Sequence, residues 1–472
     1  MDEDNSMNIN CRINNNGYEK DRLSSLPNSL LIEILSLLPL NSAAATSVLS
    51  RRWVPLWTQL PQLSIEDGYT QENFQKFITT TNHILQQFTT PHIQSFNLRF
   101  YHQNLELDQF HVCSASLNSW IPLICSRNPA NFEVSFDFSR FCRQFIPLPT
   151  CIFKTNSLVN LKLSGFFYCC LPETGVVNLP NLKKLSLNGL DFDPQVLRTL
   201  FKSCPLLETL FLKLRLMEDE LIDISTPNLK SLTILMRGSS YRSTFLIDAP
   251  LLEEIEVQDC LALYHFVKIP CNLQKSSIGC WSSKSEDSIF TKESDYMSNT
   301  TNLLKGISNV NCIQLVNNVA IFNTFNQMDA NVWSLFHNLI HLRLGLSEEH
   351  VNWGARIPSC LLSKLKKIDL LVMKGDDNDV NSIKYILSNA DVLEKLYISR
   401  FASSGKHGKS QLWKEYKFCG NLFLFTRSSL ICKIEFDGAY IHASSCGSQN
   451  VSGNSEIDWL RSQMWPASEE DD

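Results

Sequence analysis

The chain has 472 residues, of which 44% are hydrophobic and 10% aromatic, enough for two or three domains or for one small domain attached to a long repeat array. Its formal net charge of −6 provides no broad cationic field, which argues against a nucleic-acid partner bound through its phosphates. The longest apolar run, residues 30–40, is interrupted by Glu33 and Pro39 and is too short to span a bilayer.

The two ends of the sequence are polar and lack periodic apolar residues. We expect residues 1–20 to form a disordered tail and residues 444–472 a flexible acidic tail. The acidic start lacks the basic and apolar segments of a secretory signal, so we expect the protein in the nucleus or cytoplasm, with no membrane partner. Its 16 cysteines are then expected to be reduced thiols. No Cys-x-x-Cys pair occurs, and we expect no metal and no cofactor.

A short amphipathic helix is predicted between Asn28 and Pro39. Its apolar positions recur at the i, i+1, i+4, i+5, i+8 spacing of one helix face, and they are Leu30, Leu31, Ile34, Leu35 and Leu38. Asn28 or Ser29 can cap its start by accepting a hydrogen bond from a free backbone N–H. Pro39 ends it, because the proline ring clashes with the preceding turn.

A second helix is predicted over residues 43–53, where Ala45, Leu49 and Trp53 are spaced by four and Pro55 follows as a stop. A unit of about 45 residues with two or three short helices is near the lower limit of independent stability. We therefore expect a partner to cover its apolar surface.

Residues 21–67 resemble the F-box motif of plant F-box proteins, above all in the run from Thr46 to Trp53. The resemblance implies a helical hook that docks onto the Skp adaptor of a Skp–cullin–F-box ubiquitin ligase, and through it onto a cullin-RING ligase. The residues that it assigns to the adaptor contact are Leu26, Pro27, Leu30, Ile34, Leu35, Leu38, Pro39, Val48, Leu49, Trp53, Leu56 and Trp57. The alternative is that these side chains only pack against one another. Leu35 and Trp53 are expected to be large anchors at the centre of the interface.

A Leu-x-x-Leu-x-Leu pattern recurs between residues 158 and 257 with 22 to 25 residues from one repeat to the next, which is the period of leucine-rich repeats. It returns less regularly up to residue 398, and an earlier strand near residues 93–98 is expected to open the array. We predict an α/β leucine-rich-repeat solenoid over residues 68–356, an irregular arch of the ribonuclease-inhibitor type, preceded by the small all-α F-box. Residues 272–301 break the pattern and are expected to be a projecting loop or an irregular repeat.

The outward positions of the predicted strands form a candidate binding face. Residues two apart in a strand point to the same side, so the residue between the last two apolar positions of each repeat faces out. These residues are Lys162, Ser186, Phe211, Thr233, Glu256, Arg343 and Tyr397, and we expect them to line a concave face that binds a protein target. Phe211 and Tyr397 are candidate anchors, because an aromatic group on a solvated strand face is typical of an interface. A loop that covers Phe211 is the alternative.

Residues 357–437 resemble the FBD domain of plant F-box proteins. The resemblance implies one further repeat that caps the solenoid, built from a strand, a helix with Ile383, Ile386 and Leu387 on one face, and another strand. Residues 423–425 and 428–436 fit its closing strand.

Two short motifs suggest chemistry, but neither has the required context. Gly408-Lys409-Ser410 lacks the first glycine of a phosphate loop, since Ser403 takes that position, and we predict a surface loop. His337 and His341 have the spacing of a helical metal pair, but His341 falls in a predicted strand, where i and i+4 lie more than about 12 Å apart.

Three functions remain open from the sequence. The favoured one is a non-catalytic substrate receptor of a ubiquitin ligase, in which the arch holds a protein target that the sequence does not identify. A repeat scaffold that acts without ubiquitin is the second. An enzyme is the third, and it would need a site assembled in space from scattered residues, because no catalytic motif occurs.

Overall fold

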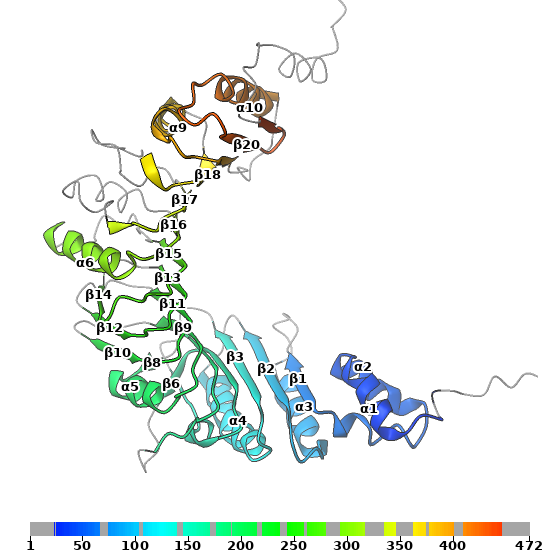
Figure 1. The fold of residues 1–472 in the computed structure, drawn as a ribbon. Coiled ribbons are helices and arrows are strands. Elements are labelled where there is room, and N and C mark those ends of the chain that lie inside the picture. Colours follow the sequence, from blue (N-terminus) through cyan, green and yellow to red (C-terminus); the bar gives the residue numbers. More distant parts are fainter. Residues whose placement is uncertain are drawn as a thin grey trace, which may run out of the picture.

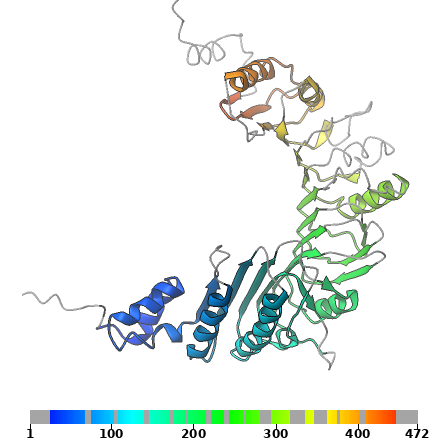
Figure 2. The same cartoon turned by 180° about the vertical axis from the view of Figure 1, so that it is seen from behind.

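The computed structural model forms an arch with residues 25–60 at one foot and residues 409–445 at the other (Figures 1 and 2). The residues it describes are 23, 25–66, 74–102, 107–138, 145–169, 176–189, 191–214, 220–236, 243–258, 262–279, 293–316, 335–345, 362–373, 377–400 and 409–445. The predicted tails lie outside the described residues, except for Ser444 and Ser445.

A single 15-stranded sheet runs the length of the arch, with each strand paired to the strand of the next repeat. Its strands are parallel except for the last pair. In order they are β1 Gln62–Glu66, β2 Ser95–His102, β3 Asn131–Phe138, β5 Asn160–Gly165, β7 Lys184–Asn188, β9 Thr209–Leu214, β11 Ser231–Met236, β13 Glu254–Gln258, β15 Lys275–Gly279, β16 Cys312–Val316, β17 His341–Gly345, β18 Lys367–Met373, β19 Lys395–Arg400, β20 Lys433–Asp437 and β21 His442–Ser445. This topology confirms the predicted solenoid.

The outer side of the sheet is covered by helices and by two small parallel sheets (Figure 1). The helices are α3 Phe74–Gln87, α4 Leu107–Cys125, α5 Pro194–Lys202, α6 Glu293–Gly306, α9 Asp377–Asn389 and α10 Lys409–Leu422. The small sheets are β4 Ile146–Pro147, β6 Phe167–Cys169 and β8 Asp191–Phe192, and β10 Leu221–Ser225, β12 Thr244–Asp248 and β14 Leu263–Phe266. Short convex strands replace helices where the repeats leave few residues between successive strands of the main sheet.

In-register rows of apolar side chains hold the repeats together. One row contains the second leucine of each predicted repeat, and its central members are Leu161, Leu185, Leu210, Leu232 and Ile255. All are nearly inaccessible to solvent. Because side chains alternate between the two faces of a strand, burying this row turns the intervening residues to the concave side.

The array begins earlier than the leucine pattern indicates. Strands β1, β2 and β3 precede the first regular repeat, and β1 lies inside the segment that resembles an F-box. The core positions of β2 and β3 are aromatic: Phe96 pairs with Phe132, and Phe100 with Phe136. The strand predicted near residues 93–98 is confirmed as β2, although β1 opens the array before it. Phenylalanine fits a half-buried strand as well as leucine does, so a leucine template misses β3.

The pattern break at residues 272–301 is an irregular repeat, because β15 continues the sheet through it. Ser276 takes the core position where the template requires an apolar residue, and it is buried. Ile278 fills the second core position. Part of α6 also lies in this range. The prediction of a projecting loop is wrong for the described residues of this segment.

The closing elements of the array differ from the prediction. Lys409 and Ser410 begin α10 instead of lying in a loop. Residues 423–425 form a turn, so the closing strand is β20 alone, and β21 then pairs back against it in antiparallel direction up to Ser445. The predicted tail therefore starts two residues too early. The buried carboxylate of Glu415 holds this hairpin by accepting backbone N–H groups, which come from Ala439, Tyr440 and Ile441.

The register predicts that a substitution in a buried row lowers the free energy of unfolding much more than a substitution in the concave row beside it. Leu210→Ala should lower the free energy of unfolding by ~2–5 kcal/mol, because it leaves a cavity in a close-packed row. Thr233→Ala on the concave side should change it by less than about 0.5 kcal/mol. Urea denaturation followed by circular dichroism measures both. A larger loss for Thr233→Ala than for Leu210→Ala would contradict this register.

Candidate interaction surfaces

Short helices at one foot of the arch form the N-terminal helical unit, residues 25–60. They are α1 Asn28–Ser36, α2 Leu40–Ala45 and the 3₁₀ turns η1 Thr46–Val48 and η2 Trp57–Gln59. The predicted second helix over residues 43–53 is wrong beyond Ala45. There the Thr46 hydroxyl donates to the carbonyl of Ala43 at 2.6 Å, and hydroxyl side chains of this kind compete with regular helix.

The start of α1 is held by an arginine rather than by a cap. Pro27 occupies the cap position and makes no side-chain hydrogen bond. Asn28, a predicted cap, instead accepts from Arg52 Nε at 2.9 Å, and Arg52 also donates to the carbonyl of Leu26. This contact ties α1 to the turn that follows η1.

Part of the predicted adaptor surface is the core of the helical unit itself. Four of the assigned residues are at most 8% exposed, and they are Leu35, Trp53, Leu56 and Trp57. They belong to one cluster of buried apolar side chains that continues into the sheet, and α2 contacts β1 directly. The expectation that Leu35 and Trp53 are accessible anchors is therefore wrong for the free protein, and truncating them would test folding instead of binding.

The other part of that surface is solvent-exposed. Val48 is 88% and Leu37 84% exposed. We call the following set the exposed apolar face: Leu30, Ile34, Leu37, Leu38, Val48 and Leu49. Pro27 and Pro39 are exposed beside it, and Leu26 is half-buried. Sequence reasoning missed Leu37 because it does not fall on the periodic face of α1; only its position before Leu38 and Pro39 marks it.

The seven predicted concave residues lie in one in-register row, the concave column. Its members, from β1 to β20, are Ser64, Asn97, Glu133, Lys162, Ser186, Phe211, Thr233, Glu256, Ser277, Gln314, Arg343, Asp369, Tyr397 and Glu435. The structure thus aligns in one row residues that are up to 235 positions apart in the sequence, from Lys162 to Tyr397.

In the first repeats of the concave face, charged side chains on neighbouring strands form ion pairs with one another. Glu133 lies 3.1 Å from Arg99 and 2.8 Å from Lys162, and Arg99 also pairs with Glu66 at 3.4 Å. Although burial raises the pKa of Glu133, the hydrogen bonds and charges of Lys162 and Arg99 outweigh it and lower the pKa overall. Lys162 is therefore committed to an ion pair.

The middle of the concave column carries an apolar spot. Phe211 is half-buried between Ser186 and Thr233, its partners on the neighbouring strands. Leu235, also half-buried, lies diagonally across on β11, within reach of an aromatic ring. Phe211 and Leu235 together offer apolar area on a face that is otherwise polar. Glu256 accepts a hydrogen bond from Gln258 at 2.7 Å.

The last repeats contain a buried carboxylate surrounded by cations. Asp369 is 2.8 Å from His341 Nε2, 3.1 Å from Arg343 Nε and 3.9 Å from Lys367 Nζ. Burial alone would raise the pKa of Asp369, but the hydrogen bond from His341 and the charges of Lys367 and Arg343 lower it overall. Arg343 also donates to Gln314 at 3.1 Å, so it is positioned by its neighbours.

The two aromatic candidates differ in their surroundings. The Tyr397 hydroxyl donates to Asp437 at 2.8 Å. Burial and this carboxylate raise the pKa of Tyr397 to about 12, so the phenol stays protonated. Phe211 has no polar group to anchor it, and is therefore the stronger candidate for an apolar contact.

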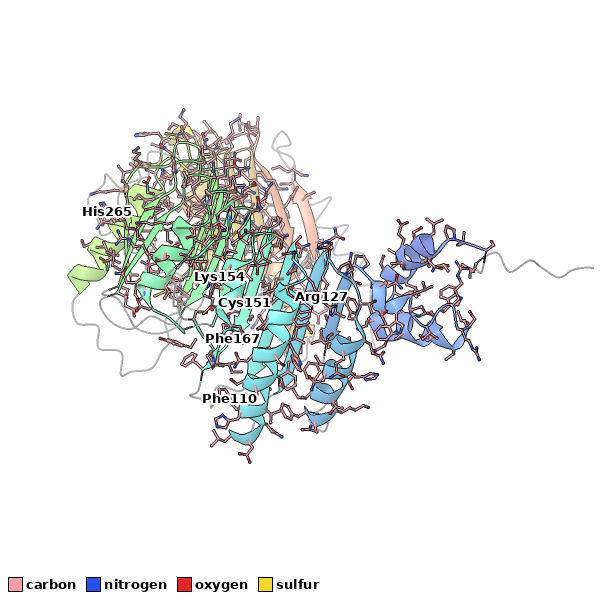
Figure 3. All side chains as sticks on the ribbon, turned by 90° about the horizontal axis from the view of Figure 1, so that it is seen from below. Phe110, Arg127, Cys151, Lys154, Phe167 and His265 are labelled. Atoms are coloured by element: carbon pink, nitrogen blue, oxygen red, sulfur yellow. The ribbon has the colours of Figure 1, made fainter. Side chains whose placement is uncertain are left out.

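Several of the described cysteines lie on the outer side of the arch. Cys151 and Lys154 lie beside α4 in Figure 3. Burial raises the pKa of Cys113 and Cys204 to about 12, which makes them inert thiols, as expected of small buried hydrophobes. Within the described residues, no three His, Cys, Asp or Glu side chains gather as a metal site requires, and no helix is long and apolar enough to cross a membrane. His341 begins β17, as predicted, and its Nε2 lies 2.8 Å from Asp369.

Three family models match separate parts of the chain. A model described as "F-box domain" matches residues 23–62, and one described as "FBD" matches residues 355–398. Between them, a model described as "FBD-associated F-box protein At5g56370, LRR repeats" matches residues 117–286. The first covers the N-terminal helical unit and the start of β1.

Curated proteins of Arabidopsis thaliana are similar over most of the chain. The FBD-associated F-box protein At4g10400 is 26% identical over 445 residues, which cover 88% of this chain and 100% of the relative. The F-box/FBD/LRR-repeat protein At5g22660 is 25% identical, with 88% and 96% covered. The F-box/LRR-repeat protein At2g42720 is 29% identical, with 75% and 78% covered.

The contact between His341 and Asp369 predicts a pH-dependent stability. Burial lowers the pKa of His341, but hydrogen bonds to Asp369 and Cys312 raise it overall above its usual 6.5. The stabilisation by protonated His341 is thus fully present below the usual pKa and is lost as the pH rises through the folded-state value. The unfolding free-energy difference between wild type and His341→Gln should therefore shrink as the pH is raised from below 6.5 through the folded-state pKa of His341.

Chemical denaturation at several pH values measures this difference. The exposed His92 provides a control, since His92→Gln should change the unfolding free energy by less than about 0.5 kcal/mol. An equal effect of His341→Gln at both ends of the range would show that the ion pair contributes nothing.

Proposed function

The chain belongs to the plant F-box proteins that carry leucine-rich repeats and an FBD domain, and we propose that it is the substrate-recognition subunit of a Skp–cullin–F-box E3 ubiquitin ligase. The F-box would bind a Skp-type adaptor, and through it a cullin-RING ligase. The concave column would bind a protein target for ubiquitination. We place this activity in the nucleus or cytoplasm.

The observation that carries the proposal is the exposed apolar face of the F-box. Its six exposed side chains all come from residues 30–49, which include α1, the residues between α1 and α2, and the turn at η1, at one end of the arch. Solvated apolar side chains of this size are unfavourable in a free protein, and a cluster of them is typical of an interaction site. A partner that covers them would gain the free energy of their burial.

The position of the two surfaces supports a tethering function. The F-box occupies one foot of the arch, and the concave face of the sheet extends away from it (Figure 1). A target held on that face stays at a fixed distance from the ligase core. Tethering of this kind raises the effective concentration of target lysines at the transferring enzyme without any catalytic group in the receptor.

A ubiquitin-independent scaffold is the alternative. It would use the concave column in the same way but would need no adaptor. Variants of the exposed apolar face of the F-box therefore distinguish the two functions. An enzyme is not proposed, because proteins of the matching families are generally non-catalytic adaptors.

Charge placed in the exposed apolar face should abolish adaptor binding. We expect Val48→Asp combined with Leu49→Asp to weaken co-purification of a Skp-type adaptor by more than about tenfold, since apolar anchors at an interface typically contribute ~2 kcal/mol or more each. The unfolding temperature should hardly change, because both side chains are exposed.

Leu430→Asp is the matched control, since Leu430 is an exposed leucine in the last repeats. Its adaptor binding should equal that of the wild type. Undiminished adaptor capture by the Val48 and Leu49 variant would leave the scaffold as the better account.

Target capture should depend on the apolar spot of the concave column. Affinity purification under proteasome block, with the F-box variant as comparison, identifies proteins that bind the arch. Phe211→Ala should reduce their recovery while adaptor binding and thermal stability stay near wild type, because Phe211 lies outside the buried rows. Arg343 is not replaced here, since its loss would also remove a partner of Asp369.

Tyr168→Ala provides an aromatic truncation on the outer side, in β6. It should leave target recovery unchanged. Equal losses for Phe211→Ala and Tyr168→Ala, or none for either, would place the target elsewhere on the chain.

A further inference from the structure

Three lysines stand in register at the C-terminal end of the concave face. Lys367 on β18 pairs with Lys395 on β19, which pairs with Lys433 on β20. We call them the lysine ladder. Neighbouring strands are about 4.8 Å apart, so the three side chains arise within about 10 Å of one another. His341 on β17 occupies the next position of the same row.

The carboxylates that partner these cations lie deeper than the cations do. The ladder side chains are 42%, 36% and 44% exposed, in chain order, whereas Asp369 is 7% and Glu435 25% exposed. Glu435 lies 2.5 Å from Lys395 and 2.9 Å from Lys433. Solvent therefore meets the ammonium groups first.

The local charges do not balance. Asp369 is shared among Lys367, Arg343 and His341, and Glu435 between the other two ladder lysines. The nearby Asp437, which lies beside Tyr397 and His442, is a third carboxylate. Among the described residues, four permanent cations and two histidines thus lie beside three carboxylates, on a protein whose net charge is −6.

Like charges directly across neighbouring strands destabilise a sheet. The ladder sets three of them side by side, and its two carboxylates only partly offset the repulsion. An anion bound above the ladder would complete the neutralisation. Three exposed ammonium groups are also hydrogen-bond donors that suit carboxylate or phosphate oxygens.

We propose that the lysine ladder binds an acidic segment of the target protein, one that carries clustered Asp and Glu or phosphorylated Ser and Thr side chains. The proposal rests on the receptor function above and assigns a chemical class to part of its target. Side chains on one face of an extended peptide are about 7 Å apart, which allows two of them to reach a ladder about 10 Å long.

Charge complementarity favours a peptide over other anions. A nucleic acid needs a longer cationic track, and the same concave face carries Glu133 and Glu256 farther along. A flat bilayer does not fit a concave sheet. The ladder is also continuous with the concave column, because Asp369, Tyr397 and Glu435 are two residues farther along the same strands.

Fluorescence anisotropy with the full chain tests the proposal. The probes are labelled peptides of alternating Glu and Ser, the same peptide with phosphoserine, and the same peptide with Gln in place of Glu. Wild type should bind the first two and not the third, with an affinity that falls as salt is raised. Lys367→Glu combined with Lys433→Glu should weaken binding by about tenfold or more.

The matched control carries the same charge change on the outer side, as Lys202→Glu combined with Lys268→Glu. Both lysines are exposed, at the end of α5 and after β14. Its affinity should stay within about twofold of wild type. Charge reversal could disrupt the fold, so the neutral double variant Lys367→Gln and Lys433→Gln is measured as well. Its stability is checked by thermal unfolding, and it should also weaken peptide binding.

Absent binding of both acidic peptides, or equal weakening by the ladder and control variants, would overturn the proposal. If the acidic peptides bind only after deletion of residues 446–472, the ladder binds the chain's own C-terminal segment, and the proposal of a target segment is overturned. Adaptor capture is measured in parallel. If the protein still captures the adaptor but binds no acidic peptide, only the proposed function of the ladder is refuted. If it does not capture the adaptor, the proposed receptor function is refuted.

Discussion

The in-register pairing of successive parallel strands is the constraint on which the rest of this structure depends. It stacks one apolar row on the next, so every repeat is buried by its neighbours and none has a core of its own. The same register sets the intervening residues in a single column. A displacement by one residue would exchange the two sets and remove both the core and the binding face.

The small helical unit at the N-terminus is stabilised by this array. Trp53, Leu56 and Trp57 join the buried cluster that extends into the sheet, and α2 contacts the first strand. A helical segment of this size could hardly fold alone. One apolar face of the unit packs toward the arch, and Leu37, Val48 and Leu49 stay in solvent, where the proposed adaptor would bind.

The concave face is divided by its electrostatics. Ion pairs between adjacent strands neutralise the first repeats, where Glu133 joins Arg99 and Lys162. The middle has the apolar spot of Phe211 and Leu235, and the last repeats present lysines above recessed carboxylates. A target of the proposed receptor would meet three different chemistries along one column, and such variation would favour specificity as well as affinity.

The sequence by itself determined the repeat architecture and the direction of the concave side chains, because both follow from local alternation. Apolar residues two apart in a strand must share a face, so Lys162, Phe211 and Tyr397 could be assigned to the same face without coordinates. The F-box and FBD segments could be identified for a similar reason, since each is a continuous run of residues.

Only the tertiary structure decided what depends on distant neighbours. Helical spacing places Leu30 and Leu35 on one face, yet tertiary packing buries Leu35 and leaves Leu30 exposed. Ser276 could be recognised as a core residue only through its strand partners, since serine matches no apolar template. The sharing of Asp369 among His341, Arg343 and Lys367 likewise joins two repeats, and no local pattern specifies how close their side chains come.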